Sequence, residues 1–149
     1  MSNRPIAESY WVEESRFLAG EYPGSHNPET ARRHMDAFLE AGITTFIDLT
    51  QAHELISYEA ILKEQARVYD LVAFYHRFAI PDHGVPSHET MTIILDTIDA
   101  AINSGRKVYV HCWGGVGRRV ALGMCDFVRR AEFFEQPEDA LRTAVIEVM

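Results

Sequence analysis

Short runs of β-branched, aromatic and other apolar residues, bounded by turn residues, recur along the chain and predict strands. The predicted strands are residues 10–12, 16–19, 43–49, 71–80 and 107–111. We interpret the run 71–80 as a buried strand that stops before Pro81, because proline cannot donate into a sheet ladder. Residues 107–111 are short, apolar and flanked by turn signals, which predicts a strand in the centre of the sheet.

Between these runs, capping residues mark where helices begin and end. Asn27 is a good N-cap and Pro28 suits the first helical position. Gly42 can take the left-handed conformation that ends this first helix. A second helix is predicted from near Ser57 to Tyr69.

The second half of the chain shows three more helical patterns. Ser87 begins a long helix that ends at Gly105. Its apolar residues at helical spacing are Met91, Ile94, Leu95, Ile98 and Ile102. Residues 120–128 are apolar nearly all round, as in a buried helix, and Pro137 opens a last helix. Alternating strands and helices predict an α/β fold, a single domain over residues 1–149 with a central, mostly parallel sheet of four to five strands flanked by helices.

The composition supports one folded domain and narrows the choice of partners. Of the 149 residues, 47% are hydrophobic and 24% are charged, which is enough for a core without disulfides or metal. The formal net charge of −8 disfavours nucleic acid and anionic membranes as partners. Two cysteines are too few for a disulfide-stapled secreted scaffold, and we find no signal peptide and no membrane span. We therefore expect a cytoplasmic protein.

The most informative segment, residues 111–118, lies between the predicted central strand and the helix after it. It reads His-Cys-Trp-Gly-Gly-Val-Gly-Arg. Its glycines allow a tight turn whose backbone N–H groups, with the positive end of the helix, form an anion-binding site. There Cys112 is expected to have a depressed pKa, and Arg118 to bind two oxygens of one phosphate. The local charge agrees, because residues 104–130 hold six basic residues and one acidic residue.

The pattern His-Cys-x5-Arg, closing a strand and opening a helix, resembles the cysteine-based protein tyrosine phosphatase superfamily, and most closely its small dual-specificity members. Three other features stand in the family's order: the strand Ile47-Asp48-Leu49, the loop Ile-Pro-Asp-His-Gly-Val-Pro at residues 80–86, and the long helix before His111. The resemblance implies the fold of that superfamily and the activity of a phosphoric monoester hydrolase, with no metal or other cofactor.

The resemblance also implies a role for individual residues. Cys112 is the nucleophile that forms a phosphocysteine, while Asp82 protonates the leaving oxygen and later activates water. Arg118 and the loop amides bind the phosphate oxygens. His111 orients the loop and helps to keep the cysteine as a thiolate. The substrate-binding positions are Trp113, Gly114, Gly115, Val116, Gly117 and Arg118.

Each of these residues also has a purely structural interpretation. A lone cysteine is usually a small core residue, which the glycine and arginine neighbours of Cys112 disfavour but which we expect for Cys125. Asp82 follows a proline and fits a simple turn, although its place between a strand and a capped helix favours function. Asp48 and Glu54 either support a loop near the site or lie at a solvated strand end. Three histidines that lack metal-ligand spacing are expected on the surface or in loops: His76, His83 and His88.

The sequence departs from the family pattern in two places. Arg119 stands where relatives usually have Ser or Thr, whose hydroxyl assists the thiolate as it leaves in the second step, and Val120 stands where glycine is common. We therefore predict that the phosphoenzyme forms faster than it hydrolyses. The chain also ends at Met149, where relatives usually continue through another helix. Truncation at the C-terminus and a partner chain over that face are both open explanations.

The expected substrate is a phosphorylated protein, carrying phosphotyrosine and also phosphoserine or phosphothreonine, or a small phosphomonoester. Residues 113–117 include no Lys or Arg to bind further phosphates, so phosphoinositides and RNA 5′-phosphates rank lower. A cysteine enzyme similar to rhodanese or arsenate reductase is an alternative, but a sulfurtransferase needs no general acid such as Asp82. A phosphate-binding pseudophosphatase is a third alternative, motivated by Arg119. The natural substrate, tyrosine versus dual specificity and the oligomeric state stay open.

Overall fold

A five-stranded sheet forms the centre of the part of the chain that the structure describes. The computed structural model describes residues 4–13, 15–51, 55–79 and 87–111. The strands are β1 (Ser9–Glu13), β2 (Phe17–Gly20), β3 (Ile43–Asp48), β4 (Phe74–Arg77) and β5 (Lys107–His111). Their order is β1-β2-β5-β3-β4, with β1 antiparallel to β2 and the other neighbours parallel. The predicted α/β class and mostly parallel sheet are confirmed, and β5 lies in the centre as expected.

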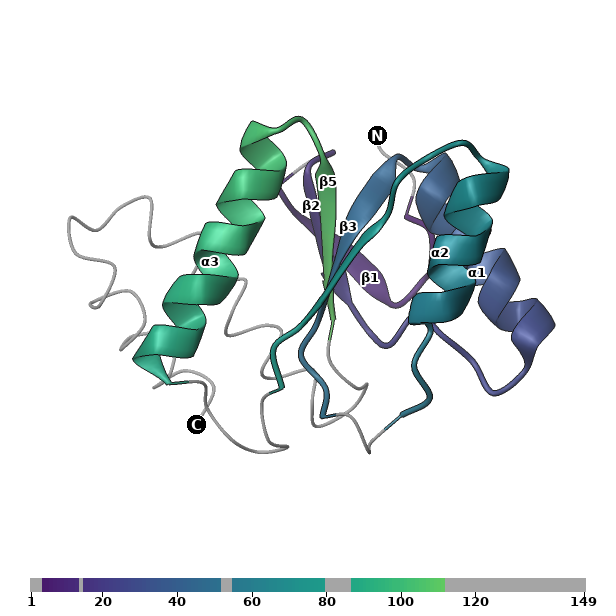
Figure 1. The fold of residues 1–149 in the computed structure, drawn as a ribbon, viewed down its shortest axis with the longest axis horizontal. Coiled ribbons are helices and arrows are strands. Elements are labelled where there is room, and N and C mark those ends of the chain that lie inside the picture. Colours follow the sequence, from purple (N-terminus) through teal and green to yellow (C-terminus); the bar gives the residue numbers. More distant parts are fainter. Residues whose placement is uncertain (1–3, 14, 52–54, 80–86, 112–149) are drawn as a thin grey trace.

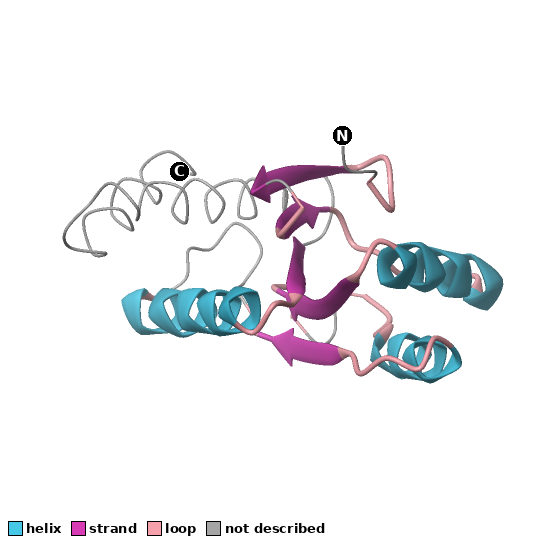
Figure 2. Ribbon diagram, turned by 90° about the horizontal axis from the view of Figure 1, so that it is seen from above, coloured by secondary structure: helices cyan, strands magenta, loops and turns pink. Residues whose placement is uncertain are grey.

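Helices cover both faces of this sheet. In the described residues, α1 (Pro28–Glu40) and α2 (Glu59–Val68) lie together on one face, and α3 (His88–Asn103) lies on the other (Figure 1). The view from above shows the same three layers, with the strands between the two groups of helices (Figure 2). Each helix corresponds to one of the three predicted before residue 106, so the alternation of strands and helices in the sequence identified the layers.

The ends of α1 and α3 form where the sequence supplies capping residues. The side chain of Asn27 accepts hydrogen bonds from two backbone N–H groups in the first turn of α1, and Ser87 accepts one in the first turn of α3. Gly42 and Gly105 follow the other ends of these helices with φ values of +84° and +82°. A side chain at either position would meet the strain of the left-handed region, so glycine lets the chain turn back into the next strand.

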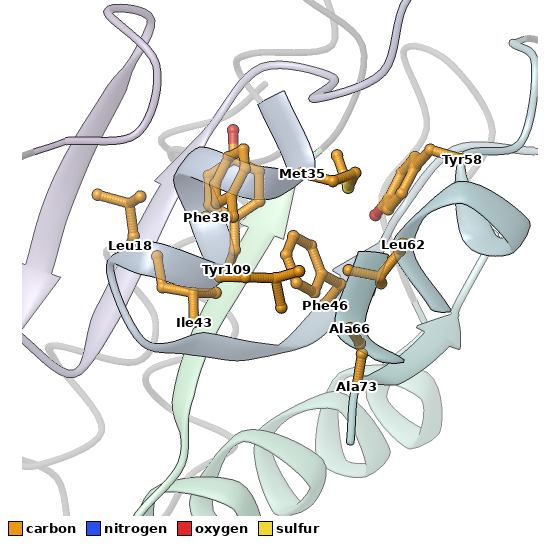
Figure 3. Close-up of a cluster of buried hydrophobic side chains, with 11 residues drawn as sticks. Leu18, Met35, Phe38, Ile43, Phe46, Tyr58, Leu62, Ala66, Ala73 and Tyr109 are labelled. Carbon is orange, nitrogen blue, oxygen red and sulfur yellow. The ribbon is translucent and has the colours of Figure 1, made fainter. Parts of the chain in front are cut away.

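An aromatic-rich core fills the space between the sheet and the pair of helices α1 and α2 (Figure 3). Its buried residues are Leu18, Met35, Phe38, Leu39, Ile43, Phe46, Tyr58, Leu62, Ala66, Ala73 and Tyr109. The ring of Phe38 lies 5.3 Å from that of Phe46 and 4.6 Å from that of Tyr109, measured between centroids. Inclined aromatic pairs at such distances stabilise a core beyond their buried area. This packing holds β3 and β5 firmly against α1.

The predicted buried strand at residues 71–80 is wrong in its extent and its burial. Only Phe74–Arg77 form β4, which lies at the edge of the sheet, and all four of its residues are partly exposed. Leu71 and Val72 precede it with 39% and 71% of their surface exposed. The apolar run therefore includes the connection after α2 as well as the strand. The helices predicted at residues 120–128 and after Pro137 lie outside the described residues.

Candidate functional site

The carboxyl ends of three parallel strands bring titratable residues side by side. Asp48 ends β3, and the sheet register places it opposite His111 at the end of β5 and Arg77 at the end of β4. Ligands of α/β proteins bind beyond the carboxyl ends of the strands. This edge of the sheet is therefore the candidate site within the described residues.

His111 is completely buried at this edge and is surrounded by aromatic rings. The centroid of its ring lies 5.3 Å from that of Tyr58, 5.8 Å from that of Tyr109 and 6.2 Å from that of Tyr22. The hydroxyl oxygen of Tyr58 is 2.5 Å from Nε2 of His111. The rings restrict rotation of the imidazole, and the hydroxyl gives Nε2 a fixed polar partner.

Asp48 uses both of its carboxylate oxygens. Oδ1 accepts hydrogen bonds from the backbone N–H of Thr50 at 2.8 Å and from its hydroxyl at 2.6 Å. Oδ2 accepts one from the hydroxyl of Tyr75 at 2.5 Å and one from the guanidinium of Arg77 at 3.1 Å. Oδ1 also lies 3.9 Å from Nε2 of His111. One buried carboxylate thus connects the ends of β3, β4 and β5.

The surroundings keep Asp48 charged and the nearby phenols neutral. Burial alone raises the pKa of Asp48, but the charge of His111 and the hydrogen bonds from Thr50 and Tyr75 outweigh burial and lower it. Burial, reinforced by the Asp48 carboxylate, raises the pKa of Tyr58 well above its ordinary value. Burial and a hydrogen bond to Asp48 likewise raise the pKa of Tyr75. Both tyrosines therefore keep their protons at neutral pH.

This arrangement can hold a positive charge on the imidazole of His111. The hydroxyl oxygen of Tyr58 can accept a hydrogen bond from an Nε2–H group, and the nearby carboxylate of Asp48 favours a proton on that nitrogen. His111 directly precedes Cys112 in the sequence. A cationic imidazole next to a cysteine favours the thiolate, which is the nucleophilic form of that side chain.

Of the predicted site residues, the structure describes only His111, and it lies at the end of the central strand as expected. The others lie outside the described residues: Asp82, Cys112, Trp113, Gly114, Gly115, Val116, Gly117 and Arg118. Glu54, Arg119 and Cys125 lie there too. The roles that the resemblance implies for these residues stay predictions.

Two residues with open or structural interpretations are placed by the structure. Asp48 is 1% exposed and bonded on both oxygens, which excludes the solvated strand end that was one of its two interpretations. His76, expected on the surface or in a loop, lies in the edge strand β4, where it is partly exposed and stacks on Phe78. Burial, with the charge of Arg106, lowers the pKa of His76.

Sequence analysis missed three residues of this site: Tyr58, Tyr75 and Arg77. Tyr75 and Arg77 are two positions apart in β4 and so share one face, and this spacing of polar groups within an apolar run was a usable signal. Tyr58 meets His111 across 53 residues of sequence. No local pattern marks a contact over that separation.

A comparison with protein families decides the relationship of the chain. A family model described as "Tc-R-P: Polymorphic toxin system, DSP-PTPase phosphatase" matches residues 21–132, well over half of the chain. The chain belongs to this family. The resemblance to dual-specificity and tyrosine phosphatases is thereby confirmed, and the match includes both the segment 111–118 and the buried carboxylate of Asp48.

Two curated proteins are similar to this chain over part of their own sequences. Cyclin-dependent kinase inhibitor 3 of Sus scrofa is 30% identical over 66 residues, which are 40% of this chain and 31% of that protein. Protein tyrosine phosphatase domain-containing protein 1 of Mus musculus is 32% identical over 130 residues, 80% of this chain and 17% of that protein. The chain thus spans less than a third of the length of these two curated relatives.

A solved structure shows the shared fold. Tk-PTP in its active form superposes with a TM-score of 0.63 at 22% identity, covering 95% of this chain and 82% of that one. Among the described residues no group of His, Cys, Asp or Glu side chains is arranged to hold a metal ion. Within the part of the chain that the structure describes, no helix is long and apolar enough to cross a membrane.

Proposed function

We propose that the protein is a phosphoric monoester hydrolase that acts on phosphotyrosine, and also on phosphoserine or phosphothreonine, in proteins. The family match over a stretch that includes the His-Cys-x5-Arg segment carries this proposal. The position of His111 supports it, because the segment that follows starts at the sheet edge where α/β proteins bind ligands. Small phosphomonoesters are substrates of the same chemistry.

In the proposed reaction Cys112 attacks phosphorus as a thiolate, and the sulfur–phosphorus bond forms as the bond from phosphorus to the substrate oxygen breaks. Asp82 gives its proton to that leaving oxygen. Asp82 then takes a proton from a water molecule, which attacks the phosphocysteine and releases inorganic phosphate and the Cys112 thiolate. Arg118 and the backbone N–H groups of residues 113–118 stabilise the charge on the equatorial oxygens.

The composition of the segment supports a substrate with a single phosphate. Residues 113–117 include no Lys or Arg, and the chain as a whole carries a net charge of −8. Further phosphate groups on a phosphoinositide or a nucleic acid would therefore meet repulsion from the rest of the surface. A panel of phosphotyrosine, phosphoserine and phosphothreonine peptides of equal length separates tyrosine from dual specificity.

Arg119 makes the second step the slow one in this proposal. A guanidinium cannot reproduce the compact hydrogen bond that a Ser or Thr hydroxyl gives to the departing thiolate. Rapid-quench kinetics should show a burst of product followed by a slower steady state, and Arg119→Thr should raise the steady-state rate. A wild-type time course with no burst would contradict slow hydrolysis of the phosphoenzyme.

Hydrolysis of p-nitrophenyl phosphate tests the assignment. Cys112→Ser should abolish turnover, whereas Cys125→Ser, which changes the other cysteine of the chain, should leave it unchanged. Asp82→Ala should lower turnover by about 10²- to 10⁴-fold, the usual contribution of a general acid. Asp96→Ala, on the exposed side of α3, is the matched control. Wild-type turnover by Cys112→Ser would overturn the proposed nucleophile, and thiosulfate turnover without phosphatase activity would favour a sulfurtransferase.

A further inference from the structure

The steps proposed above start from the Cys112 thiolate but assign no role to the buried carboxylate of Asp48, which lies near His111. We infer that Asp48 is a positioning residue that keeps a proton on Nε2 of His111, so that the positive imidazole stabilises the thiolate of Cys112. The catalytic relevance of this inference rests on the proposed function. The effect of Asp48 on the reactivity of the Cys112 thiol can be measured without a substrate.

The geometry fixes the carboxylate in place. Its four hydrogen bonds, two from Thr50 and one each from Tyr75 and Arg77, occupy both oxygens. A carboxylate held in this way cannot turn away from its neighbours without breaking several charge-assisted bonds. Oδ1 is thereby kept 3.9 Å from Nε2 of His111.

Of the described neighbours of His111, Asp48 is the one whose charge favours a proton on the imidazole. Among the residues that the structure describes, the groups that face its ring include Tyr22 before α1, Tyr58 before α2, Tyr109 of β5 and Asp48 of β3. Burial raises the pKa of Tyr22 and of Tyr58, which keeps these two phenols neutral at neutral pH, and Asp48 is the carboxylate in this group. The cation beyond it, Arg77, contacts the opposite carboxylate oxygen, Oδ2. A proton on Nε2 therefore has an anion on one side and the oxygen of Tyr58 as acceptor on the other.

Removal of the carboxylate has two opposing effects on the Cys112 thiol. Loss of the anion withdraws the charge that keeps His111 protonated, which destabilises the thiolate. Loss of the same anion leaves Arg77 without its counter-charge, which favours the thiolate. Coulomb energy falls with distance, and His111 adjoins Cys112 in the chain, whereas Arg77 lies two strands away from β5 and is 25% exposed to screening water. The effect through His111 should win, so the thiol pKa should rise.

Alkylation by iodoacetamide over a range of pH measures this directly. The Cys125→Ser background leaves Cys112 as the single cysteine. In that background Asp48→Asn should move the alkylation midpoint to higher pH, with about tenfold slower alkylation below the midpoint, as expected for the loss of one nearby charge. Asp96→Asn on the exposed side of α3 is the matched control and should leave the midpoint in place.

A double-mutant comparison separates positioning through His111 from a general structural effect. In a His111→Asn background, Asp48→Asn should no longer raise the alkylation midpoint, because only the opposing effect of Arg77 remains. Tyr58→Phe, which keeps the buried ring and removes only the hydroxyl at Nε2, should shift the midpoint in the same direction as Asp48→Asn. This milder change keeps the test valid where Asp48→Asn folds poorly. An unchanged midpoint in Asp48→Asn, or an equal shift in both backgrounds, would overturn the inference.

Phosphatase assays on the same proteins keep this inference distinct from the proposed function. With p-nitrophenyl phosphate, the acid limb of the kcat/KM profile should move to higher pH in Asp48→Asn. If the wild type hydrolyses no phosphomonoester, the proposed function fails, while the alkylation midpoints still decide the role of Asp48. If the wild type is active and the acid limb and midpoints do not move, the inference alone fails.

Discussion

Replacing Asp48 by asparagine keeps the shape of the side chain but removes its charge and half of its capacity to accept hydrogen bonds. Four donor contacts reach the carboxylate, two from Thr50 and one each from Tyr75 and Arg77. An asparagine amide accepts at its oxygen alone. Thr50 is 3% exposed, so the amide oxygen should turn toward it and leave the NH₂ group facing the donors of Tyr75 and Arg77.

The expected loss of unfolding free energy at neutral pH is about 2–3 kcal/mol. A hydrogen bond to a charged group contributes about 1.5–3 kcal/mol, and two such bonds are lost on one side of the carboxylate. Tyr75 and Arg77 are only partly buried and regain hydrogen bonds to water, so the loss should be closer to one bond than to two. Breaking a fully buried ion pair would lower the free energy of unfolding by more than this.

The size of this loss should depend on pH. The folded protein lowers the pKa of Asp48 from its ordinary value of 3.8. The carboxylate therefore contributes its full stability above the unfolded pKa, and this contribution is lost as the pH falls through the folded pKa. The difference in stability between wild type and Asp48→Asn should be largest at neutral pH and should shrink below about pH 4.

Urea unfolding of both proteins at neutral and at acid pH provides the measurement. Asp96→Asn, at an exposed position of α3, is the matched control and should differ from wild type by less than about 0.5 kcal/mol. A loss below about 0.5 kcal/mol for Asp48→Asn at neutral pH, or a loss that does not change with pH, would refute the argument from its hydrogen bonds.

Three further predictions concern the rest of the described fold. Asn27→Ala removes the side-chain cap of α1 and should lower the free energy of unfolding in urea by about 1 kcal/mol; an unchanged midpoint would argue against the cap. Ile98→Ala leaves a cavity at a fully buried position of α3 and should cost about 2–5 kcal/mol in the same assay, whereas a loss under about 1 kcal/mol would show that the site is not packed. The hydrogen bond to Glu40, helped by some desolvation, raises the pKa of Tyr69 to about 12. The phenolate absorbance that Tyr69→Phe removes should therefore titrate near that value, and a midpoint at the ordinary 10.0 would contradict the bond.

Helix boundaries followed from the sequence because their signals are local. Asn27 and Ser87 satisfy N–H groups only two or three residues away, and Gly42 and Gly105 act through their own backbone conformation. A segment of a few residues is therefore enough to predict where such a helix begins or ends. The strand at residues 71–80 was extended too far because hydrophobicity alone does not separate an edge strand from the exposed connection before it.

The site was predictable only where its residues are adjacent in sequence. His111 was identified through the motif that follows it, whereas Tyr58 and Arg77 reach the site from other elements. Asp48 ends a strand, a position that fits a solvated side chain as well as a buried one. Pairing of β3 with β4 and β5 decides between these interpretations, and that pairing depends on the packing of the whole sheet.

Phosphoryl transfer through Cys112 is the central claim, and the mass of the peptide that contains Cys112 tests it most directly. The measurement uses a reaction with p-nitrophenyl phosphate stopped by a rapid denaturing quench. The expected result is a wild-type peptide heavier by one phosphoryl group, with no such species in Cys112→Ser and less of it in Arg119→Thr. Turnover by the wild type with the phosphoryl group on another residue, or with Cys112 unmodified at every quench time, would contradict the claim.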